Sequence, residues 1–448
     1  EYDALDRAVK LWQPAPADTA AAAGFYGDTR PWTDYIYDSD GSERVVSTTA
    51  PGKDMIGHPA TAEYLCNTQS GELRCRRFVL DGERLTDKGA YADASLDVVR
   101  AIDADGHRVL TFSDWRGRTV LVRKVLAEGK YIDTYTVYDH WGNVAVVLQP
   151  MAEGGLKGGS YDISDGGMDE VIEKYAYVYR YDDALRPVYA KLPGCDPVTT
   201  VYDPDGLVAY TVDGNLRAKG NARFTLYDAA ARPVVTGICN EPTGVVPRMR
   251  ATLDTSANGL DKTGYTTEAT LGGVKVLTAT YYDGYDCLAL SQFESIPDNF
   301  RPSGIRAPGL VTASLDRVLS GTLNSRSAKY VATVTGYNSE EHPTRVAVWY
   351  PESETAMLTE NVYNIDGTVA SSINTLQHPT GDHTDSHTYA YDAAGRLVKE
   401  TVSYDGGEAV DVQKLSYNAI GTLSGNDLGV FNEEYTYNVR GAMTKRKS

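Results

Sequence analysis

A cluster of histidines and aspartates is the part of the sequence whose residue types and spacing come closest to a reactive site. The segment LQHPTGDHTDSHT holds His378, Asp382, His383, Asp385 and His387. A spacing of four residues would place His383 and His387 on one face of a helix, where both could bind zinc. However, HTDSH lacks the glutamate that a zinc protease needs, and a proline and a glycine in the segment favour a loop. We therefore expect a solvated turn, keep a metal site as the alternative, and assign no metal ligand and no cofactor.

The cysteines show no pattern of a metal site. No C-x-x-C pair is present, which argues against zinc knuckles and redox motifs. Cys66 and Cys75 flank NTQSGELR, so they could face each other across two strands and form a disulfide in an exported protein. Cys195 and Cys239 each follow a repeat and could be neighbours on adjacent strands. The alternative for all of them, Cys287 included, is a small buried hydrophobic side chain.

Carboxylates and nucleophiles show no catalytic pattern. Asp139, Asp203 and Asp392 occupy turn positions, where backbone geometry already explains them. A glycosidase would need two carboxylates that face each other in a cleft, which a sequence cannot show. The sequence contains no G-x-S-x-G motif, phosphate-binding glycine loop or nucleophile triad. We expect a protein that is not an enzyme and assign no catalytic residue.

Tryptophans offer the other candidate binding groups. Trp115 and Trp141 fall in expected turns, and exposed aromatic rings bind carbohydrates or proteins. Packing between neighbouring strands is the favoured interpretation for each of the five, so binding residues stay unassigned. The five are Trp12, Trp32, Trp115, Trp141 and Trp349.

The candidate residues above must be positioned by the secondary structure around them. The stretch YAYDAAGRLVKE, which begins at Tyr389, indicates what that secondary structure is. Tyr389 and Tyr391 are two apart and share one face of a strand. The carboxylate of Asp392 suits the first position of a type I turn, because it can accept a backbone N–H two residues on. Gly395 supplies the positive φ that a type I turn followed by a bulge requires. The stretch therefore predicts a β-hairpin.

The same pattern, Tyr, Asp or Asn, two free positions and Gly, occurs seven times, so it is a repeat. Relaxed copies begin at other tyrosines and lack the glycine. Leucine and glutamate tolerate positive φ poorly, so we expect another turn type at Leu185 and Glu341. The strict copies begin at Tyr37, Tyr138, Tyr202, Tyr363, Tyr391, Tyr417 and Tyr437, and the relaxed ones at Tyr2, Tyr181, Tyr227, Tyr282 and Tyr337.

The repeat runs along the whole chain, which favours one continuous architecture. We expect loops at 13–34, 150–169, 293–309 and 376–388, and one short helix from Asp169 to Ala176 capped by Asp169. Residues 1–448 then form a single β scaffold, with a possible sub-boundary at the glycine-rich segment 150–169. The fold class is all-β: repeated antiparallel hairpins that form a curved strip or partial shell.

The motif Y-D-x-x-G-R resembles the YD repeat of the Rhs family of bacterial proteins. Three further stretches are similar to the Rhs-repeat proteins of Bacteroidetes: TFSDWRGRTVL, TYTVYDHWGNVAVVLQP and KLPGCDPVTTVYDPDGLVAYTVDGNLRAKG. The resemblance implies a spiralling β-sheet strip that can close into a hollow shell. In some members that shell encloses a C-terminal toxin, and others act in surface adhesion. It also implies that a self-cleaving core segment and any toxin would lie beyond Ser448.

The amino-acid composition and net charge exclude some classes of binding partner. The chain has 32 Tyr against 7 Phe, which suits surfaces that partly face water. Its net charge of −18 argues against nucleic acid and anionic membranes, and no apolar stretch is long enough to span a bilayer. The chain opens inside a repeat, at EYDALDR, so we expect a segment of a longer protein.

These features together predict a structural role. We expect a non-enzymatic scaffold of a secreted or cell-surface protein, which encloses or presents a C-terminal cargo such as a toxin. A carbohydrate- or protein-binding surface adhesin is the alternative.

Overall fold

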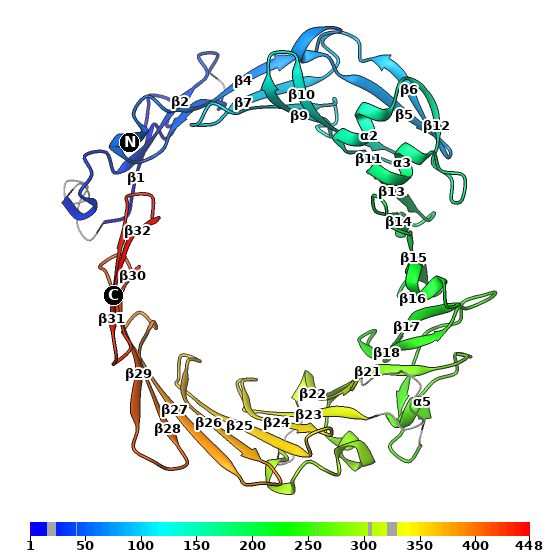
Figure 1. Cartoon of the computed structure of the whole chain (residues 1–448), viewed down its shortest axis with the longest axis vertical. Coiled ribbons are helices and arrows are strands. Elements are labelled where there is room, and N and C mark those ends of the chain that lie inside the picture. The colour runs from blue at the N-terminus through cyan, green and yellow to red at the C-terminus, as the bar shows by residue number, and fades with distance from the viewer. Residues whose placement is uncertain (16–23, 42, 258, 303–306, 320–328) are drawn as a thin grey trace. The chain divides into compact units, whose positions relative to one another are not determined.

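The computed structural model of the chain describes residues 1–15, 24–41, 43–257, 259–302, 307–319 and 329–448. Strands joined by tight turns make up most of the described residues, which confirms the all-β prediction (Figure 1). The chain divides into two compact units. Unit 1 comprises residues 1–198, 418–422 and 435–446, and unit 2 comprises 199–417, 423–434 and 447–448. The sub-boundary predicted at 150–169 lies inside unit 1, and the single scaffold stays a prediction.

Unit 1 is an antiparallel sheet in which successive strands pair in chain order. Two places break this order, because β4 pairs with β7 instead of β5, and β11 pairs with β13 instead of β12. The strands are β1 (Lys10–Trp12), β2 (Trp32–Tyr37), β3 (Val45–Thr49), β4 (Ala60–Cys66), β7 (Asp97–Ile102), β8 (Arg108–Ser113), β9 (Thr119–Ala127), β10 (Lys130–Tyr138), β11 (Val144–Leu148), β13 (Ala176–Tyr181) and β14 (Pro187–Lys191).

A second layer covers the middle of this sheet. It consists of β5 (Arg76–Asp81), β6 (Arg84–Ala90) and β12 (Gly159–Asp162), with helices α2 (Pro150–Gly155) and α3 (Glu170–Tyr175) beside β11 and β13 (Figure 1). Burial of apolar side chains between the layers stabilises them. The buried cluster includes Leu110, Phe112, Leu121 and Val146 from the sheet, and Leu85, Ala152 and Ile172 from the covering layer.

Segment 150–169 was wrongly predicted to be a loop, because α2 and β12 form there. The predicted helix after Asp169 is present as α3. The Asp169 side chain does not cap it, because its carboxylate accepts the backbone N–H of Asp162 instead (2.5 Å). The glycine content of this segment indicated a loop. The local sequence does not show that β12 pairs with β6, and this pairing supplies the backbone hydrogen bonds of the strand.

Unit 2 has the same antiparallel order, except that β18 pairs with β21 and β19 pairs with β20 apart from the main sheet. A second buried cluster extends from Ala209 to Leu358. Its strands are β15 (Val198–Tyr202), β16 (Val208–Val212), β17 (Asn221–Tyr227), β18 (Pro233–Asn240), β19 (Thr252–Leu253), β20 (Tyr265–Thr266), β21 (Lys275–Asp283), β22 (Ala307–Arg317), β23 (Tyr330–Tyr337), β24 (Pro343–Tyr350), β25 (Thr355–Tyr363), β26 (Val369–Gln377), β27 (His383–Tyr391), β28 (Leu397–Tyr404), β29 (Val410–Tyr417) and β30 (Leu423–Asp427). Strand β31 (Asn432–Tyr437) spans both units and β32 (Met443–Lys447) ends the chain, while α4 (Gly214–Arg217) and α5 (Gly259–Lys262) are short.

None of the described helices has the length and apolar character needed to cross a lipid bilayer.

Candidate functional site

The turns of most repeats are held by their own aspartate or asparagine. In the hairpin of β27 and β28, Asp392 Oδ1 accepts the backbone N–H groups of Ala394 (2.9 Å) and Arg396 (3.0 Å). The Arg396 side chain donates from Nε to Asp392 Oδ2 (2.7 Å), and this bond lowers the pKa of the Asp392 carboxyl below its usual value. Gly395 has φ 74°, and a register shift follows Ala390, so the predicted turn with a bulge is confirmed.

The tyrosines of most repeats bond their hairpin to the preceding one. The hydroxyl of Tyr417 donates to the carbonyl of Leu397 (2.8 Å), the first residue after the preceding turn. The hydroxyl of Tyr391 donates to Val369 in the same way (2.9 Å). The same offset, six residues after the start of the preceding motif, recurs for Tyr37, Tyr181, Tyr227, Tyr282 and Tyr363. It also holds for Tyr138 if counted from Ser113, which begins the copy SDWRG that keeps the turn and lacks the tyrosine. We call this bond the tyrosine latch.

The arginine after the glycine position completes the latch. Arg396 lies over the ring of Tyr417 with its guanidinium carbon 4.6 Å from the ring centre. Arg118 over Tyr138 (4.6 Å) and Arg232 over Tyr282 (4.3 Å) repeat this cation–π contact. The arginine therefore binds the aspartate of its own turn and the tyrosine of the next. Sequence reasoning missed this link, although the R of Y-D-x-x-G-R carried the signal.

Two turns correct the sequence prediction. Leu185 and Glu341 have φ of 60° and 65°, and each turn keeps the hydrogen bonds of the glycine-containing copies. The predicted change of turn type is wrong, because the side-chain bonds to the turn outweigh the left-handed strain, about 1–2 kcal/mol. The copy at Tyr282 does differ: Asp286, at its glycine position, begins a 3-10 helix.

Only part of the histidine cluster lies in the predicted loop, and the rest lies on a strand. His383, Asp385 and His387 belong to β27, so the period of two, not a helical period of four, places them on one face. His387 Nε2 lies 2.9 Å from Asp385 and its Nδ1 lies 3.0 Å from Glu400. These two contacts occupy both ring nitrogens. His378 and Asp382 lie in the turn before β27. The metal site predicted from these five residues stays an alternative that the structure does not test.

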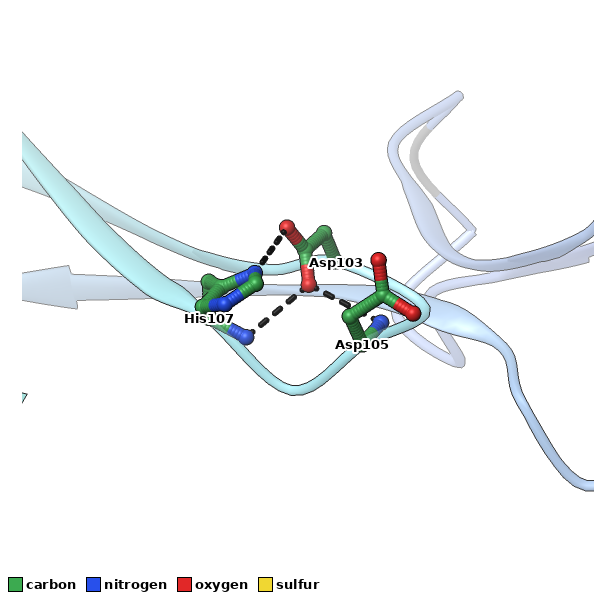
Figure 2. A group of neighbouring side chains, drawn as sticks. All are labelled: Asp103, Asp105 and His107. Atoms are coloured by element: carbon green, nitrogen blue, oxygen red, sulfur yellow. Dashed lines mark hydrogen bonds and ion pairs between the residues drawn. The ribbon is translucent and has the colours of Figure 1, made fainter.

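A different group of possible metal ligands lies in the turn between β7 and β8. Asp103, Asp105 and His107 place one ligand atom each within 4.8 Å of one another, and all three are exposed (Figure 2). Asp103 Oδ1 accepts the backbone N–H groups of Asp105 and His107, and Oδ2 lies 2.9 Å from His107 Nδ1. The backbone bond from His107 is the largest contribution to the lowered pKa of Asp103. This group is a turn of the repeat type, in which the aspartate is already hydrogen-bonded.

All five cysteines are free. The predicted Cys66–Cys75 disulfide is absent because Cys66 lies opposite Asp97 on β7, while the carbonyl of Cys75 accepts from Tyr91. Cys195 is exposed and Cys239 is buried. Burial raises the pKa of Cys75 and of Cys287 to about 12 and that of Cys239 to about 11, so these thiols stay protonated at neutral pH.

The tryptophans divide into packed and exposed ones. Trp12 and Trp32 contact each other across β1 and β2 with ring centres 4.6 Å apart, and Trp349 packs against the core of unit 2. Trp115 and Trp141 are 80% and 66% exposed at the tips of two turns. Trp115 borders a cavity of about 590 Å³ in unit 1, which β5 and the segment after β6 line from the other side.

Comparisons with known proteins identify the fold. No family model and no curated protein sequence matches the chain. The crystal structure of TcdB2-TccC3-Cdc42 aligns with all of this chain at a TM-score of 0.59 and 12% identity. The crystal structure of TcdB2-TccC3 (0.59, 13%) and a variant Tc holotoxin pore of Photorhabdus luminescens (0.55, 13%) also align over the full chain. This chain spans 18% of the length of each of those chains, and at such identities the likeness shows the fold alone.

Proposed function

We propose that the chain is a non-enzymatic β-shell scaffold of the Rhs/YD type. It forms a wall that encloses or presents a C-terminal cargo, such as a toxin, in a secreted or cell-surface protein. The proposed partner is that cargo, and nucleic acid is not a proposed partner because the net charge of −18 repels a polyanion.

The tyrosine latch is the observation that supports this proposal. It joins hairpins through one side-chain bond at the same offset from Tyr37 to Tyr417, and a cation–π contact accompanies that bond at Tyr37, Tyr138, Tyr282 and Tyr417. A sheet built in this way extends by adding hairpins, and each addition needs only its neighbour. An extended wall is therefore reachable without a continuous second layer. The fold shared with the Tc toxin structures supports the same proposal.

The test uses the full-length protein that contains residues 1–448, with an epitope tag on its C-terminal continuation. Thermolysin is added to the native protein, and survival of the tag is followed over time. The variant Tyr363→Ala/Tyr391→Ala/Tyr417→Ala removes three latches. Tyr404→Ala is the matched control, because Tyr404 is exposed and belongs to no latch.

Enclosure predicts that the tag survives in the unmodified protein and in Tyr404→Ala but is lost quickly in the triple variant. The proposal is contradicted if the continuation is cut as fast in the full-length protein as when it is expressed alone.

A second candidate function, recognition of carbohydrate or protein by a surface adhesin, is favoured by one observation. Trp115 and Trp141 are largely exposed to water, so the chain does not gain the free energy that burial of the two indoles would provide. Exposed aromatic side chains of this kind often mark a binding surface.

A further inference from the structure

The cavity beside Trp115 lies between the sheet and its covering layer. The turn-bearing ends of β8, β9 and β10 form one side, and β5 with the segment 91–96 forms the other. Its volume of about 590 Å³ falls in the range of small-ligand sites, about 300–1,000 Å³. All its lining residues belong to unit 1.

Two indoles belong to the turns that border the cavity: Trp115 lines it, and Trp141 follows the lining residue His140. The turns of Trp115 and Trp141 are neighbours, because Tyr138 donates to Thr119 and the side chain of Arg118 reaches Gly142. Two strand spacings separate the turns, roughly 10 Å. Arg116 covers one face of the Trp115 ring at 4.7 Å, and with 80% of the residue exposed the other face is open.

The polar groups around the cavity are of two kinds. The carboxylates of Asp114 and Asp139 are occupied by hydrogen bonds within their own turns. Arg77 and the Tyr91 hydroxyl, in contrast, have no ion pair or hydrogen bond with the described residues; Arg77 is exposed and Tyr91 half-buried. The His140 imidazole likewise has no hydrogen bond or ion pair with the described residues, and its ring lies 4.6 Å from the Trp141 ring.

We propose that this cavity binds an acidic saccharide, one whose sugar units carry carboxylates. This inference deepens the second candidate function and is independent of the scaffold. A flat open indole suits the apolar face of a sugar ring, while donors at the rim suit its hydroxyl groups. Arg77 is the lining cation without an ion pair, and its guanidinium carbon lies 5.9 Å from the centre of the Tyr91 ring. Asp139 is the lining anion without an ion pair, but its oxygens accept hydrogen bonds within its own turn. The guanidinium of Arg77 can therefore bind a ligand carboxylate with two parallel hydrogen bonds.

A neutral apolar ligand fits this chemistry less well. Its burial would leave Arg77, Tyr91 and His140 without partners in a dry site, and each buried unpaired group costs binding free energy. The negative charge of the whole chain does not oppose an anion strongly at this point, because charges beyond about 8 Å are largely screened at physiological ionic strength.

The test measures binding of two probes to the intact chain by calorimetry and by the tryptophan fluorescence spectrum. The probes are the hexamer of galacturonic acid and, as the neutral comparison, the hexamer of xylose. The variants are Trp115→Ala and Arg77→Gln, and Tyr404→Ala, an exposed aromatic outside the cavity, is the control.

The unmodified chain and Tyr404→Ala are expected to bind the galacturonic acid hexamer more tightly than the xylose hexamer. Trp115→Ala should weaken this binding about tenfold, and Arg77→Gln should remove the preference for the acidic probe. No binding of either probe, a preference for xylose, or unchanged binding by Trp115→Ala would overturn the proposal. Saccharide binding that survives Trp115→Ala would leave adhesion standing but assign it to another surface, and the protease test of the scaffold is unaffected by either result.

Discussion

Strands β8–β11 and strands β26–β29 carry the same turns and latches but differ in what covers them. In the first set Leu110, Phe112, Leu121 and Val146 are fully buried under the second layer. In the second set only Ser372 and Val402 are buried among the strand residues, all of which the structure describes. The tyrosine latch is present in both, at Tyr138 and at Tyr417.

Because both regions have the latch and only one has a covering layer, we infer that the repeat motif and the hydrophobic core have separate roles. The motif sets which strands pair and in what register, because its bonds are made within one turn and to the next hairpin. The core adds stability where a second layer exists. In β26–β29 polar side chains take its place, with Asn374, Asp385, His387 and Glu400 linked by hydrogen bonds across neighbouring strands.

The largest expected effect tests the core. Phe112→Ala should destabilise unit 1 by about 3–5 kcal/mol, because a fully buried aromatic ring leaves a cavity. Ile373→Ala, at a 39% exposed position of β26, should cost no more than about 1 kcal/mol. Urea unfolding combined with hydrogen exchange at β8 and β26 measures both. Equal costs would contradict the division between covered and uncovered strands.

The next effect tests the turns. Gly395→Val should destabilise the protein by about 1–2 kcal/mol, because valine resists φ 74° even though no atom lies within 4 Å of the added Cβ. Leu185→Gly should stabilise it by about 0.5–1 kcal/mol, since the strained leucine has φ 60° and is 45% exposed. Melting temperatures measure both changes, and a destabilising Leu185→Gly would show that packing holds this turn.

The latch itself should contribute about 1 kcal/mol per hydroxyl. Tyr417→Phe and Tyr138→Phe each remove one bond to a carbonyl while keeping the ring under its arginine. We expect similar losses of unfolding free energy in the covered and the uncovered region, because the bond is local. A loss confined to Tyr417→Phe would mean that the second layer replaces the latch where it is present.

The smallest effect is a pH dependence. The folded-state pKa of Asp392 lies below its unfolded value, mainly because Arg396 donates to it. Its contribution to stability is therefore complete above about pH 4 and is lost as pH falls through the folded pKa. The melting temperatures of the unmodified chain and Arg396→Gln should differ at pH 7, and the difference should become smaller as pH falls below 4, leaving the part due to the contact of Arg396 with Tyr417. A difference that stays constant with pH would assign the effect of Arg396 to its contact with Tyr417 alone.

Local features were predictable and non-local ones were not. The hairpin at Asp392 and Gly395 was predicted correctly, because a turn depends on a few adjacent residues. His383 and His387 were placed in a loop, because a polar segment shows no periodicity and only its pairing with β26 and β28 makes it a strand. The disulfide prediction failed for a similar reason, since β4 pairs with β7, which is distant in sequence.

The candidate saccharide site shows the same limit. Trp115 and Trp141 were recognised as turn residues, but Arg77 and Tyr91 come from the covering layer. No sequence pattern indicates which side chains meet across two layers, because that depends on how β5 packs over β10.

By itself, the sequence determined the all-β class, the hairpin turns and their repetition, because these follow from the φ preferences and hydrogen-bonding groups of neighbouring residues. Only the tertiary structure decided which strands receive a second layer, which cysteines are buried and which polar groups surround the cavity. These properties depend on contacts between residues far apart in the chain, and such contacts form only when the folded state outweighs the entropy of bringing them together.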